Sequence, residues 1–239
     1  MVTKNQINLF RQIKRKRNRR EKKLFIVEGK KSIDEFLTSN YKLHEIYSTH
    51  PNEFNLDSII NISSSELSKL SSLKKPNKHI AIFHHKDQVL QKQNFYLVFD
   101  RINDPGNLGT IIRTCHWFGV DQIICSIDSV DCYNSKVVQS SMGSLSKVNV
   151  VYTDLIKFIK TTNKKIIGTS LNSKSISDYS FKNFDGIIVF GSESNGISLD
   201  VKRVINDYIS IPKTASNSTA ESLNLSISVA IFLSKIRGI

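Results

Sequence analysis

The sequence predicts an α/β protein with a mostly parallel sheet and a smaller α/β domain preceding it. Apolar strand segments alternate with helical segments from residue 95 onward, which is the pattern of a parallel sheet covered by helices on both faces. A polar stretch without periodicity at 86–94 separates this region from the N-terminal part. We therefore expect two domains, at 1–90 and 91–239.

The N-terminal domain is predicted to combine short strands with helices. Apolar residues at Ile7, Phe10 and Ile13 fall on one face of a helix over 4–20, and the Ser-x-x-Glu spacing at 63–66 is typical of a capping box. The predicted strands cover 24–27, 43–48, 57–62 and 79–83, and the predicted helices cover 4–20, 30–37 and 63–73.

The second domain is predicted from strands and helices that alternate along the chain. Short apolar runs bounded by turn-forming residues indicate strands, and longer amphipathic stretches indicate helices. The predicted strands cover 95–99, 122–125, 148–152, 165–169, 186–190 and 208–211, and the predicted helices cover 107–118, 135–139, 153–160, 198–204 and 221–236.

Basic residues dominate the charge of the chain. Its 239 residues carry a formal net charge of +13, which favours a polyanionic partner, although a general enrichment in lysine would give the same bias. Residues 11–23 contain nine basic residues and one acidic residue, next to the apolar run 25–27. This cluster is either a solvated face or a phosphate-binding surface, and we favour phosphate binding. The candidate contacts are Arg11, Lys14, Arg15, Arg17, Arg19 and Arg20.

Several kinds of chemistry are disfavoured by what the sequence lacks. It has no Gly-rich dinucleotide loop, no phosphate-binding loop and no Gly-x-Ser-x-Gly motif. The histidines show no metal-ligand spacing with cysteine or carboxylate residues, so we expect no metal. Hydride transfer, nucleotide hydrolysis and zinc chemistry are therefore disfavoured. We expect the histidines at surfaces or boundaries: His44, His50, His79, His84, His85 and His116.

Cysteine usage and hydropathy suggest the compartment. The three cysteines form no Cys-x-x-Cys pair, and their odd number argues against a disulfide framework. Cys115 and Cys125 lie in apolar runs and are expected in the core. No apolar stretch approaches the length of a membrane span, and the N-terminus lacks the apolar core of a signal peptide. We expect a cytoplasmic protein.

Three separate blocks place polar turns directly after apolar strands. The first, 100–114, reads Asp-Arg-Ile-Asn-Asp-Pro-Gly-Asn-Leu-Gly-Thr-Ile-Ile-Arg-Thr. Its Asp-Pro-Gly-Asn turn leads into a helix that we expect Asn107 to cap, with Arg113 in the first two turns. A guanidinium there suits a phosphate or a ribose oxygen. The alternative is a helix cap followed by a surface arginine.

The other two blocks follow the same plan. In 189–197, two glycines flank Glu193, which exposes backbone groups to a ligand, although an ordinary strand-to-helix loop is the alternative. In 211–230, Ile-Pro and a polar loop lead into a long helix. Ser222 is expected to cap it, which leaves Asn224 in the first turn, where asparagine is a poor helix former. Because ligands bind at strand ends in open α/β sheets, the blocks predict one site.

Together and in this order, the blocks resemble the motifs of the SpoU class (TrmH type) of RNA ribose 2′-O-methyltransferases in the SPOUT superfamily. The resemblance implies a knotted sheet with helices on both faces, S-adenosylmethionine (S-adenosyl-L-methionine) as methyl donor, and a homodimer formed through this domain. The catalytic residues it implies are Asn107, Arg113, Glu193, Ser222 and Asn224. The cofactor contacts it implies are Thr169, Gly191, Gly196, Ile211, Leu223 and Leu225.

The N-terminal part resembles the substrate-binding domain often fused to this class, through Leu-Phe-Ile-Val-Glu-Gly at 24–29 and the helix that follows. The implied partner is RNA, either rRNA or tRNA. One departure is the loop 213–220, which is longer than usual and lacks the glycine that customarily follows Ile-Pro. Two alternatives stay open, methylation of a base nitrogen and a non-catalytic RNA-binding protein. The intact set of five catalytic residues argues against the second.

Overall fold

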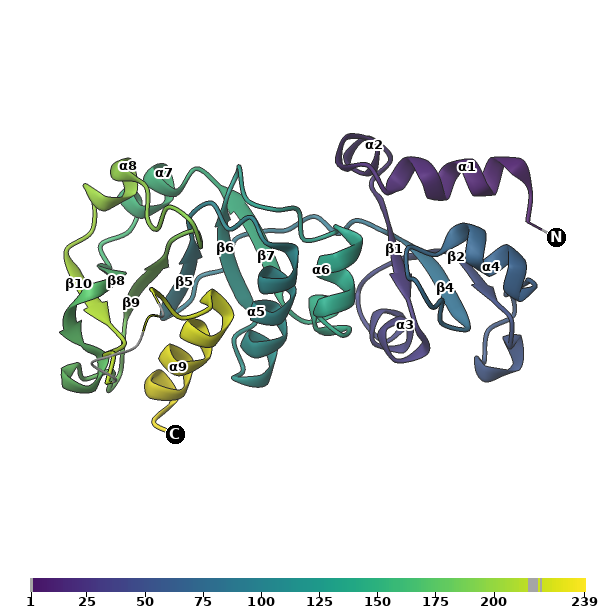
Figure 1. The fold of residues 1–239 in the computed structure, drawn as a ribbon. Helices are drawn as coiled ribbons and strands as arrows, with labels where there is room; N and C mark the ends of the chain where they lie inside the picture. The colour runs from purple at the N-terminus through teal and green to yellow at the C-terminus, as the bar shows by residue number, and fades with distance from the viewer. Residues whose placement is uncertain (1, 215–218, 220) are drawn as a thin grey trace. The chain divides into compact units, whose positions relative to one another are not determined.

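The structure, a computed structural model, describes residues 2–214, 219 and 221–239 (Figure 1). The described chain forms two compact units. Unit 1 comprises the residues up to Asp87 together with 131–147, and unit 2 comprises 88–130 and the residues from Val148 onward. The segment 131–147, which the sequence places in the second domain, packs in unit 1 because its apolar and aromatic side chains are buried against the first sheet.

Unit 1 is built on a four-stranded sheet with the strand order β1-β4-β2-β3. β4 is antiparallel to β1 and to β2, and β3 is parallel to β2. Its strands are β1 (Leu24–Glu28), β2 (Leu43–Ser48), β3 (Ile60–Asn61) and β4 (His79–His84), its helices are α1 (Lys4–Ile13), α2 (Lys16–Lys22), α3 (Lys30–Leu37), α4 (Ser64–Leu70) and α6 (Ser135–Ser140), and its 3-10 turns are η1 (Pro51–Glu53) and η2 (Ser144–Ser146).

Helices cover both faces of this sheet. On one face, Phe10 of α1 and Leu70 of α4 belong to the apolar cluster of the strands. Successive strand residues point to opposite faces, and on the other face Phe25 of β1 packs against aromatic rings. Its ring centroid lies 5.4 Å from that of Phe36 in α3 and 4.6 Å from that of Tyr133 in the 131–147 segment. That segment therefore completes the core of unit 1.

The N-terminal basic region folds differently from the single helix predicted over 4–20. α1 ends and α2 begins around Arg15, which has an extended backbone (φ −88°, ψ 131°). The buried Arg19 donates through Nη1 to the carbonyl oxygens of Ile13 and Lys14, at 3.0 and 3.1 Å. These carbonyls lie at the end of α1, so Arg19 supplies hydrogen bonds that a continuous helix would have supplied itself.

Most other elements predicted for unit 1 are confirmed. Ser63 Oγ accepts from the backbone N–H of Glu66, and Glu66 accepts from the backbone N–H of Ser63, which is the predicted capping box. The strand predicted over 57–62 is reduced to β3, and α4 ends at Leu70 rather than at residue 73. The differences fall at element ends, where local sequence is least decisive.

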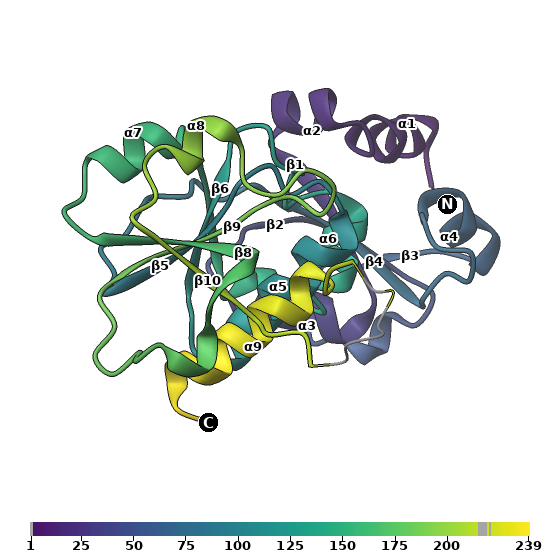
Figure 2. The ribbon, with the colours of Figure 1, turned by 60° about the vertical axis from the view of Figure 1, so that its left-hand side comes forward.

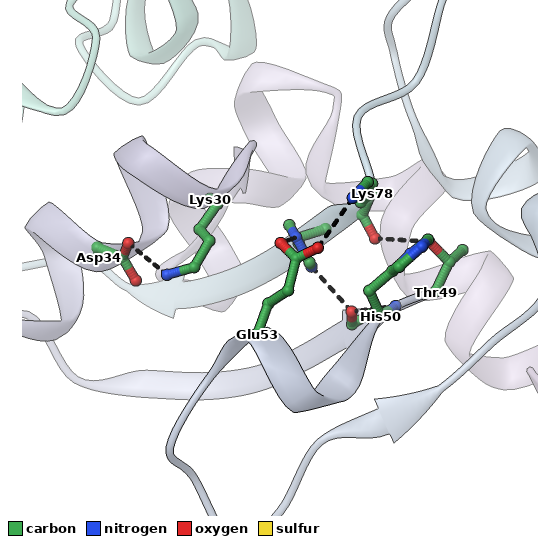
Figure 3. Close-up of polar contacts among 8 residues, drawn as sticks. Lys30, Asp34, Thr49, His50, Glu53 and Lys78 are labelled. Carbon is green, nitrogen blue, oxygen red and sulfur yellow. Dashed lines mark hydrogen bonds and ion pairs between the residues drawn. The ribbon is translucent and has the colours of Figure 1, made fainter.

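One histidine of unit 1 is buried, contrary to the prediction for all six. His79 is 2 % exposed, with Nδ1 2.8 Å from Ser48 Oγ and Nε2 2.9 Å from Glu53 Oε2. Lys78 Nζ donates to the other oxygen of Glu53 at 2.9 Å (Figure 3). Hydrogen bonds from Lys78 and His79 lower the pKa of Glu53 to about 2, and burial lowers the pKa of His79. The hydrogen bond between Glu53 and His79 links η1 to β4, and both nitrogens of the buried imidazole ring are paired.

Unit 2 is a six-stranded sheet in the order β10-β8-β9-β5-β6-β7, and every neighbouring pair is parallel. This confirms the predicted fold class. Its strands are β5 (Phe95–Phe99), β6 (Gln122–Ser126), β7 (Asn149–Thr153), β8 (Lys165–Ser175), β9 (Gly186–Phe190) and β10 (Asp207–Ser210), its helices are α5 (Pro105–Trp117), α7 (Leu155–Lys160), α8 (Leu199–Lys202) and α9 (Leu225–Arg237), and its 3-10 turn is η3 (Ile176–Asp178).

β8 runs beyond the strand predicted over 165–169. Gly168 pairs with Tyr208 of β10, but the next residue of β10 pairs with Lys174. The five residues 169–173 therefore bulge out of the ladder. A register shift of this kind depends on the partner strand, so the apolar pattern of β8 alone does not predict it.

Helices cover both faces of the unit 2 sheet (Figures 1 and 2). α7 and α8 cover one face, where Phe158 and Val201 belong to the same apolar cluster as Val98 of β5. α5 and α9 pack together on the other face, where the ring centroids of Phe190 and Phe232 lie 5.3 Å apart. The predicted core cysteines are buried there as well, and burial raises the pKa of both thiols: Cys115 and Cys125.

Within the part of the chain that the structure describes, no helix combines the length and the apolar character that crossing a membrane requires.

Candidate active site

The carboxyl ends of the central strands bring the three sequence blocks to one edge of the sheet. Phe99, the last residue of β5, pairs with Phe190, the last residue of β9. The ladder continues one residue further, because the N–H of Asp100 donates to the carbonyl of Phe190 at 2.8 Å. From β5 the chain fills one side of the sheet with β6 and β7, and then fills the other side with β8, β9 and β10. The blocks thus meet at a topological switch point, where α/β sheets bind ligands.

The first block positions Asn107 by a different route from the predicted one. α5 begins at Pro105, and its N-cap is Asp104, whose Oδ1 accepts from the N–H of Asn107 at 2.7 Å. Aspartate followed by proline at the first helical position is a standard signal for the start of a helix, and it is a stronger signal than Asn107 as the cap. Because Asp104 caps the helix, the side chain of Asn107 is available for other contacts.

The third block also starts its helix at a different residue. α9 begins at Leu225 and its N-cap is Asn224, not the predicted Ser222. Asn224 Oδ1 accepts from the N–H groups of Ser226 and Ile227 at 2.9 and 3.4 Å, and from Ser226 Oγ at 2.6 Å. Asparagine is among the best N-cap residues, which resolves its unfavourable position in the predicted first turn.

Three of the predicted catalytic residues form one hydrogen-bonded group. Asn224 Nδ2 donates to Asn107 Oδ1 at 2.9 Å, and Asn107 Nδ2 donates to Glu193 Oε1 at 2.7 Å. The chain of bonds runs from the N-terminal amides of α9, through two side-chain amides, to a carboxylate. Glu193 and Asn224 are exposed and Asn107 is half-buried, so a substrate can reach the group.

The loop that carries Glu193 is closed by its own backbone. Ser192 and Gly196 exchange two backbone hydrogen bonds, at 3.0 and 2.9 Å. Gly191 is required by close packing, because a Cβ there would lie 2.1 Å from the carbonyl carbon of Gly196. Gly196 has φ +65°, a conformation that glycine adopts without cost. The loop therefore presents its exposed backbone in a fixed shape.

A buried aspartate that the sequence analysis did not select forms a hydrogen bond to the chain just after this loop. Asp100 is 3 % exposed, and its Oδ2 accepts from the N–H of Ser198 at 2.7 Å. Ser198 is the N-cap of α8, which follows the Glu193 loop. A carboxylate immediately after a buried strand was the available signal, since such a group must find donors when it is buried.

Arg113 and Ser222, the other two predicted catalytic residues, stand apart from the hydrogen-bonded group. Arg113 lies six residues after Asn107 on α5, and Ser222 lies two residues before the cap of α9. Both are exposed. Neither makes a hydrogen bond or ion pair with any other residue that the structure describes.

The predicted cofactor contacts lie along the same edge. Thr169 follows the last β8 residue before the bulge, and its Oγ1 donates to the carbonyl of Val189 at 3.2 Å. Ile211 follows β10, and Leu223 precedes the α9 cap with half of its surface exposed. Leu225 is buried. Most of the loop 213–220, including 215–218 and 220, lies outside the described residues.

The basic cluster on α1 and α2 contains two residues that are already engaged. Arg19 is 3 % exposed and forms an ion pair with Asp131 at 2.7 Å, so it cannot contact a phosphate as predicted. Lys14 Nζ donates to the carbonyl of Ser71 at 3.0 Å, and burial lowers its pKa. The remaining predicted contacts are exposed: Arg11, Arg15, Arg17 and Arg20.

The described residues include no cluster of three or more histidine, cysteine, aspartate or glutamate side chains arranged to hold a metal ion.

Comparison with known proteins identifies the family. The model of the SpoU rRNA Methylase family matches residues 94–234, and that of the MRM3-like substrate binding domain matches residues 4–81. The chain belongs to the SpoU rRNA methylase family. It is similar to the 23S rRNA (guanosine(2553)-2′-O)-methyltransferase of Bacillus subtilis, with 26 % identity over 98 % of this chain and 97 % of that protein. It is also similar to the 23S rRNA (guanosine-2′-O-)-methyltransferase of Blochmanniella floridana, with 36 % identity over 57 % of this chain and 54 % of that protein.

Solved structures agree with this assignment. An RNA methyltransferase of the TrmH family from Porphyromonas gingivalis superposes with a TM-score of 0.87 at 29 % identity, over 100 % of this chain and 99 % of that one. The AdoMet-bound rRNA methyltransferase of Sinorhizobium meliloti shares the fold, with a TM-score of 0.87 at 23 % identity, over 100 % and 96 % of the two chains. The protein is thus a member of the SpoU rRNA methylase family by sequence and shares the fold of these methyltransferases.

The residues at the strand edge fit a nucleoside cofactor. A Cβ built on Gly196 would meet no atom within 4 Å, so the backbone there borders open space. Exposed backbone groups of this loop can read the edge of a base, and the half-exposed Leu223 offers an apolar surface for a ring. The cofactor contacts themselves stay a prediction.

We predict that Gly191→Ala weakens cofactor binding by at least about tenfold, because the added methyl group forces the Glu193 loop away from its closed shape. Isothermal titration calorimetry with S-adenosylmethionine and with its demethylated product measures the effect. Ser194→Ala is the control in the same loop and should stay within about twofold of the unsubstituted protein. Equal affinities for the two variants, both folded, would show that the loop does not hold the cofactor.

Proposed function

We propose that this protein transfers the methyl group of S-adenosylmethionine to a ribose 2′-hydroxyl of ribosomal RNA. The observation that carries the proposal is the joined group of Asn107, Glu193 and Asn224, which assembles residues from three separate blocks at the ligand-binding edge of the sheet. The B. subtilis relative, which the chain matches over nearly its whole length, is named for 23S rRNA. That name favours rRNA over tRNA as the substrate.

The proposed reaction is an in-line attack of the ribose oxygen on a methyl group. S-adenosylmethionine, when bound, supplies an electrophilic sulfonium methyl. Arg113 engages the 2′-hydroxyl: its guanidinium orients that group and stabilises the negative charge that develops on the oxygen. Arginine is almost never deprotonated, so it acts as a donor rather than as the base, and the proton of the hydroxyl passes to water as the bond to the methyl group forms. Much of the rate then comes from positioning.

Glu193 and the two asparagines serve as acceptors and donors that hold the reacting groups. One oxygen of Glu193 is occupied by Asn107, which fixes the plane of the carboxylate and leaves the second oxygen to accept a hydrogen bond from a ligand. Asn224 fixes Asn107 in turn. The hydroxyl of Ser222 lies next to the α9 cap and can bond the RNA or the cofactor.

Product analysis tests the reaction itself. The purified protein is incubated with S-adenosylmethionine and, in separate reactions, with rRNA or tRNA, and the RNA is digested to nucleosides for mass spectrometry. A 2′-O-methylated nucleoside is the expected product. A base-methylated nucleoside would move the protein to the alternative reaction, a product from tRNA alone would change the substrate, and no product from either RNA would support a binding protein without activity.

We predict that Arg113→Ala lowers the single-turnover rate at saturating RNA and cofactor by at least about a hundredfold, while melting temperature and cofactor affinity stay unchanged. Arg113→Lys should also be slow, because lysine offers a point charge where a two-pronged donor is needed. Arg203, an exposed arginine directly after α8, provides the control, and Arg203→Ala should react normally. Near-normal turnover by Arg113→Ala would mean that the site has been placed wrongly.

Unit 1 is proposed to bind the RNA. The exposed side chains of Arg11, Arg15, Arg17 and Arg20 lie on or between the two N-terminal helices of a unit that matches a substrate binding domain. Positive charges so spaced attract the phosphate backbone without reading sequence. Arg17 also pairs with Glu21 at 2.9 Å, but the pair is exposed and contributes little to stability.

We predict that replacing these four arginines by glutamine weakens RNA binding and flattens its salt dependence, by about 0.7–0.9 in log–log slope for each phosphate that is no longer neutralised. Filter binding at several salt concentrations measures the slope. The matched control removes the same number of charges from exposed residues of unit 2, namely Lys157, Lys160, Lys202 and Arg203. A full salt slope in the arginine variant would reduce the cluster to a solvated surface.

We further infer a homodimer formed through unit 2, a trefoil-knotted chain and a cytoplasmic location, as the family resemblance implies. The apolar face of α9 does not support the dimer, because Val229, Phe232 and Leu233 are buried inside the unit. Support comes instead from apolar side chains on the outer surfaces of the packed helices α5 and α9: Trp117 is 85 % exposed and Ile227 is 53 % exposed.

We predict that the full chain sediments as a dimer at micromolar concentration and that the double variant Trp117→Glu/Ile227→Lys sediments as a monomer, since charged groups on both helices would have to be desolvated in the interface. Leu199→Lys, at an exposed site on α8, should leave the dimer intact. A monomeric unsubstituted protein would refute the dimer.

A further inference from the structure

Arg19 and Asp131 form a buried clasp at a point where the chain passes between its two units. Arg19 donates through Nε and Nη2 to Asp131 Oδ2, at 2.9 and 2.7 Å, while Nη1 is bonded to two carbonyls at the end of α1. The side chains of the pair are 3 % and 7 % exposed. All three nitrogens of the guanidinium are engaged, so the residue is unsuited to contacting RNA.

The partners of this clasp come from two different family segments. Arg19 lies in the part that matches the substrate binding domain, and Asp131 lies in the part that matches the methylase. Asp131 is the first residue of the segment 131–147, and its Oδ1 accepts from the N–H of Tyr133 at 3.0 Å. Further along, a Cβ on Gly143 would lie 2.8 Å from Cγ of Glu35 in α3, so the segment packs tightly in unit 1.

Val130, the residue before Asp131, is held in unit 2 by two hydrogen bonds. The N–H of Val130 donates to the carbonyl of Ile102 at 2.8 Å, and the hydroxyl of Tyr152 donates to the carbonyl of Val130 at 2.6 Å. Ile102 is fully buried and lies two residues before Asp104, the cap that leaves Asn107 free for Glu193. Val130 is thus bonded to the turn that presents Asn107.

A serine pair extends this support. Ser129 and Ser126 have hydroxyl oxygens 2.9 Å apart, and Ser126 Oγ accepts from the N–H of Arg101 at 2.8 Å. Arg101 has φ +59°, which is uncommon for a side chain of this size and is sustained only when neighbours over-determine it. The stretch 126–130 therefore braces 101–102, immediately before the catalytic turn.

We propose that Arg19 and Asp131 are positioning residues for methyl transfer: the clasp fixes Asp131, and through the peptide bond to Val130 it holds the Ile102–Asp104 turn that presents Asn107. The inference rests on the proposed function. It assigns to Arg19 a role distinct from that of its exposed neighbour Arg20, which belongs to the RNA-contacting cluster.

Arg19→Lys and Asp131→Glu test the clasp, because both keep opposite charges at the site while breaking its geometry. Hydrogen–deuterium exchange of the full chain reports on the Val130 amide, and steady-state kinetics report kcat and the KM for RNA. We expect exchange of the Val130 amide to accelerate by at least about tenfold. We expect kcat to fall by about tenfold while the KM for RNA stays within about twofold.

Two control variants separate positioning from RNA binding and from general destabilisation. Arg20→Gln should raise the KM for RNA and leave Val130 exchange unchanged. Leu67→Ala opens a cavity elsewhere in unit 1, so it should lower the melting temperature without lowering kcat. The Val130 readout does not require activity, so it stays decisive even if no methyl transfer is found. Unchanged Val130 exchange, an unchanged kcat in folded variants, or an effect confined to the KM for RNA overturns the proposal.

Discussion

The parallel pairing of β5 with β9 is the constraint on which the candidate site depends. The two strands match residue for residue from Phe95 with Gly186 to Phe99 with Phe190, so they end together. The turns that follow them carry Asn107 and Glu193, which are 86 positions apart in the chain and are joined by a 2.7 Å hydrogen bond. A slip of one residue would turn every side chain of a strand to the opposite face, so the register that builds the core also builds the site.

Helix capping then decides which polar groups remain for chemistry. Asp104 accepts from the N–H of Asn107 in the first turn of α5, and Asn224 accepts from the N–H of Ser226 in α9 with its oxygen while its amide nitrogen donates to Asn107. The group that results uses neutral amides to orient one carboxylate. A buried counter-charge would have carried a larger desolvation cost, and this site instead stays open to solvent on the substrate side.

Unit 1 uses a charged pair where unit 2 uses amides. Arg19 and Asp131 are both removed from water, and such a pair is stable only when its remaining donors and acceptors are satisfied. Here the carbonyls at the end of α1 accept from Arg19, and the N–H of Tyr133 donates to Asp131. The pair explains why the basic run at 11–23 does not form one helix and why one of its arginines is not a phosphate contact. It also explains how 131–147, although part of the methylase match, completes the other unit.

The sequence by itself determined the alternation of strands and helices, the parallel fold class, the buried cysteines and the three blocks, because these depend on periodicity and turn chemistry that act over a few residues. Only the tertiary structure decided that Asp104 and Asn224 are the caps, that 169–173 bulge from β8, that His79 and Arg19 are buried, and that 131–147 pack with the first sheet. Each of these depends on partners distant in the chain. The local sequence determines which bonds a residue can make, and the fold determines which partner lies close enough to bond.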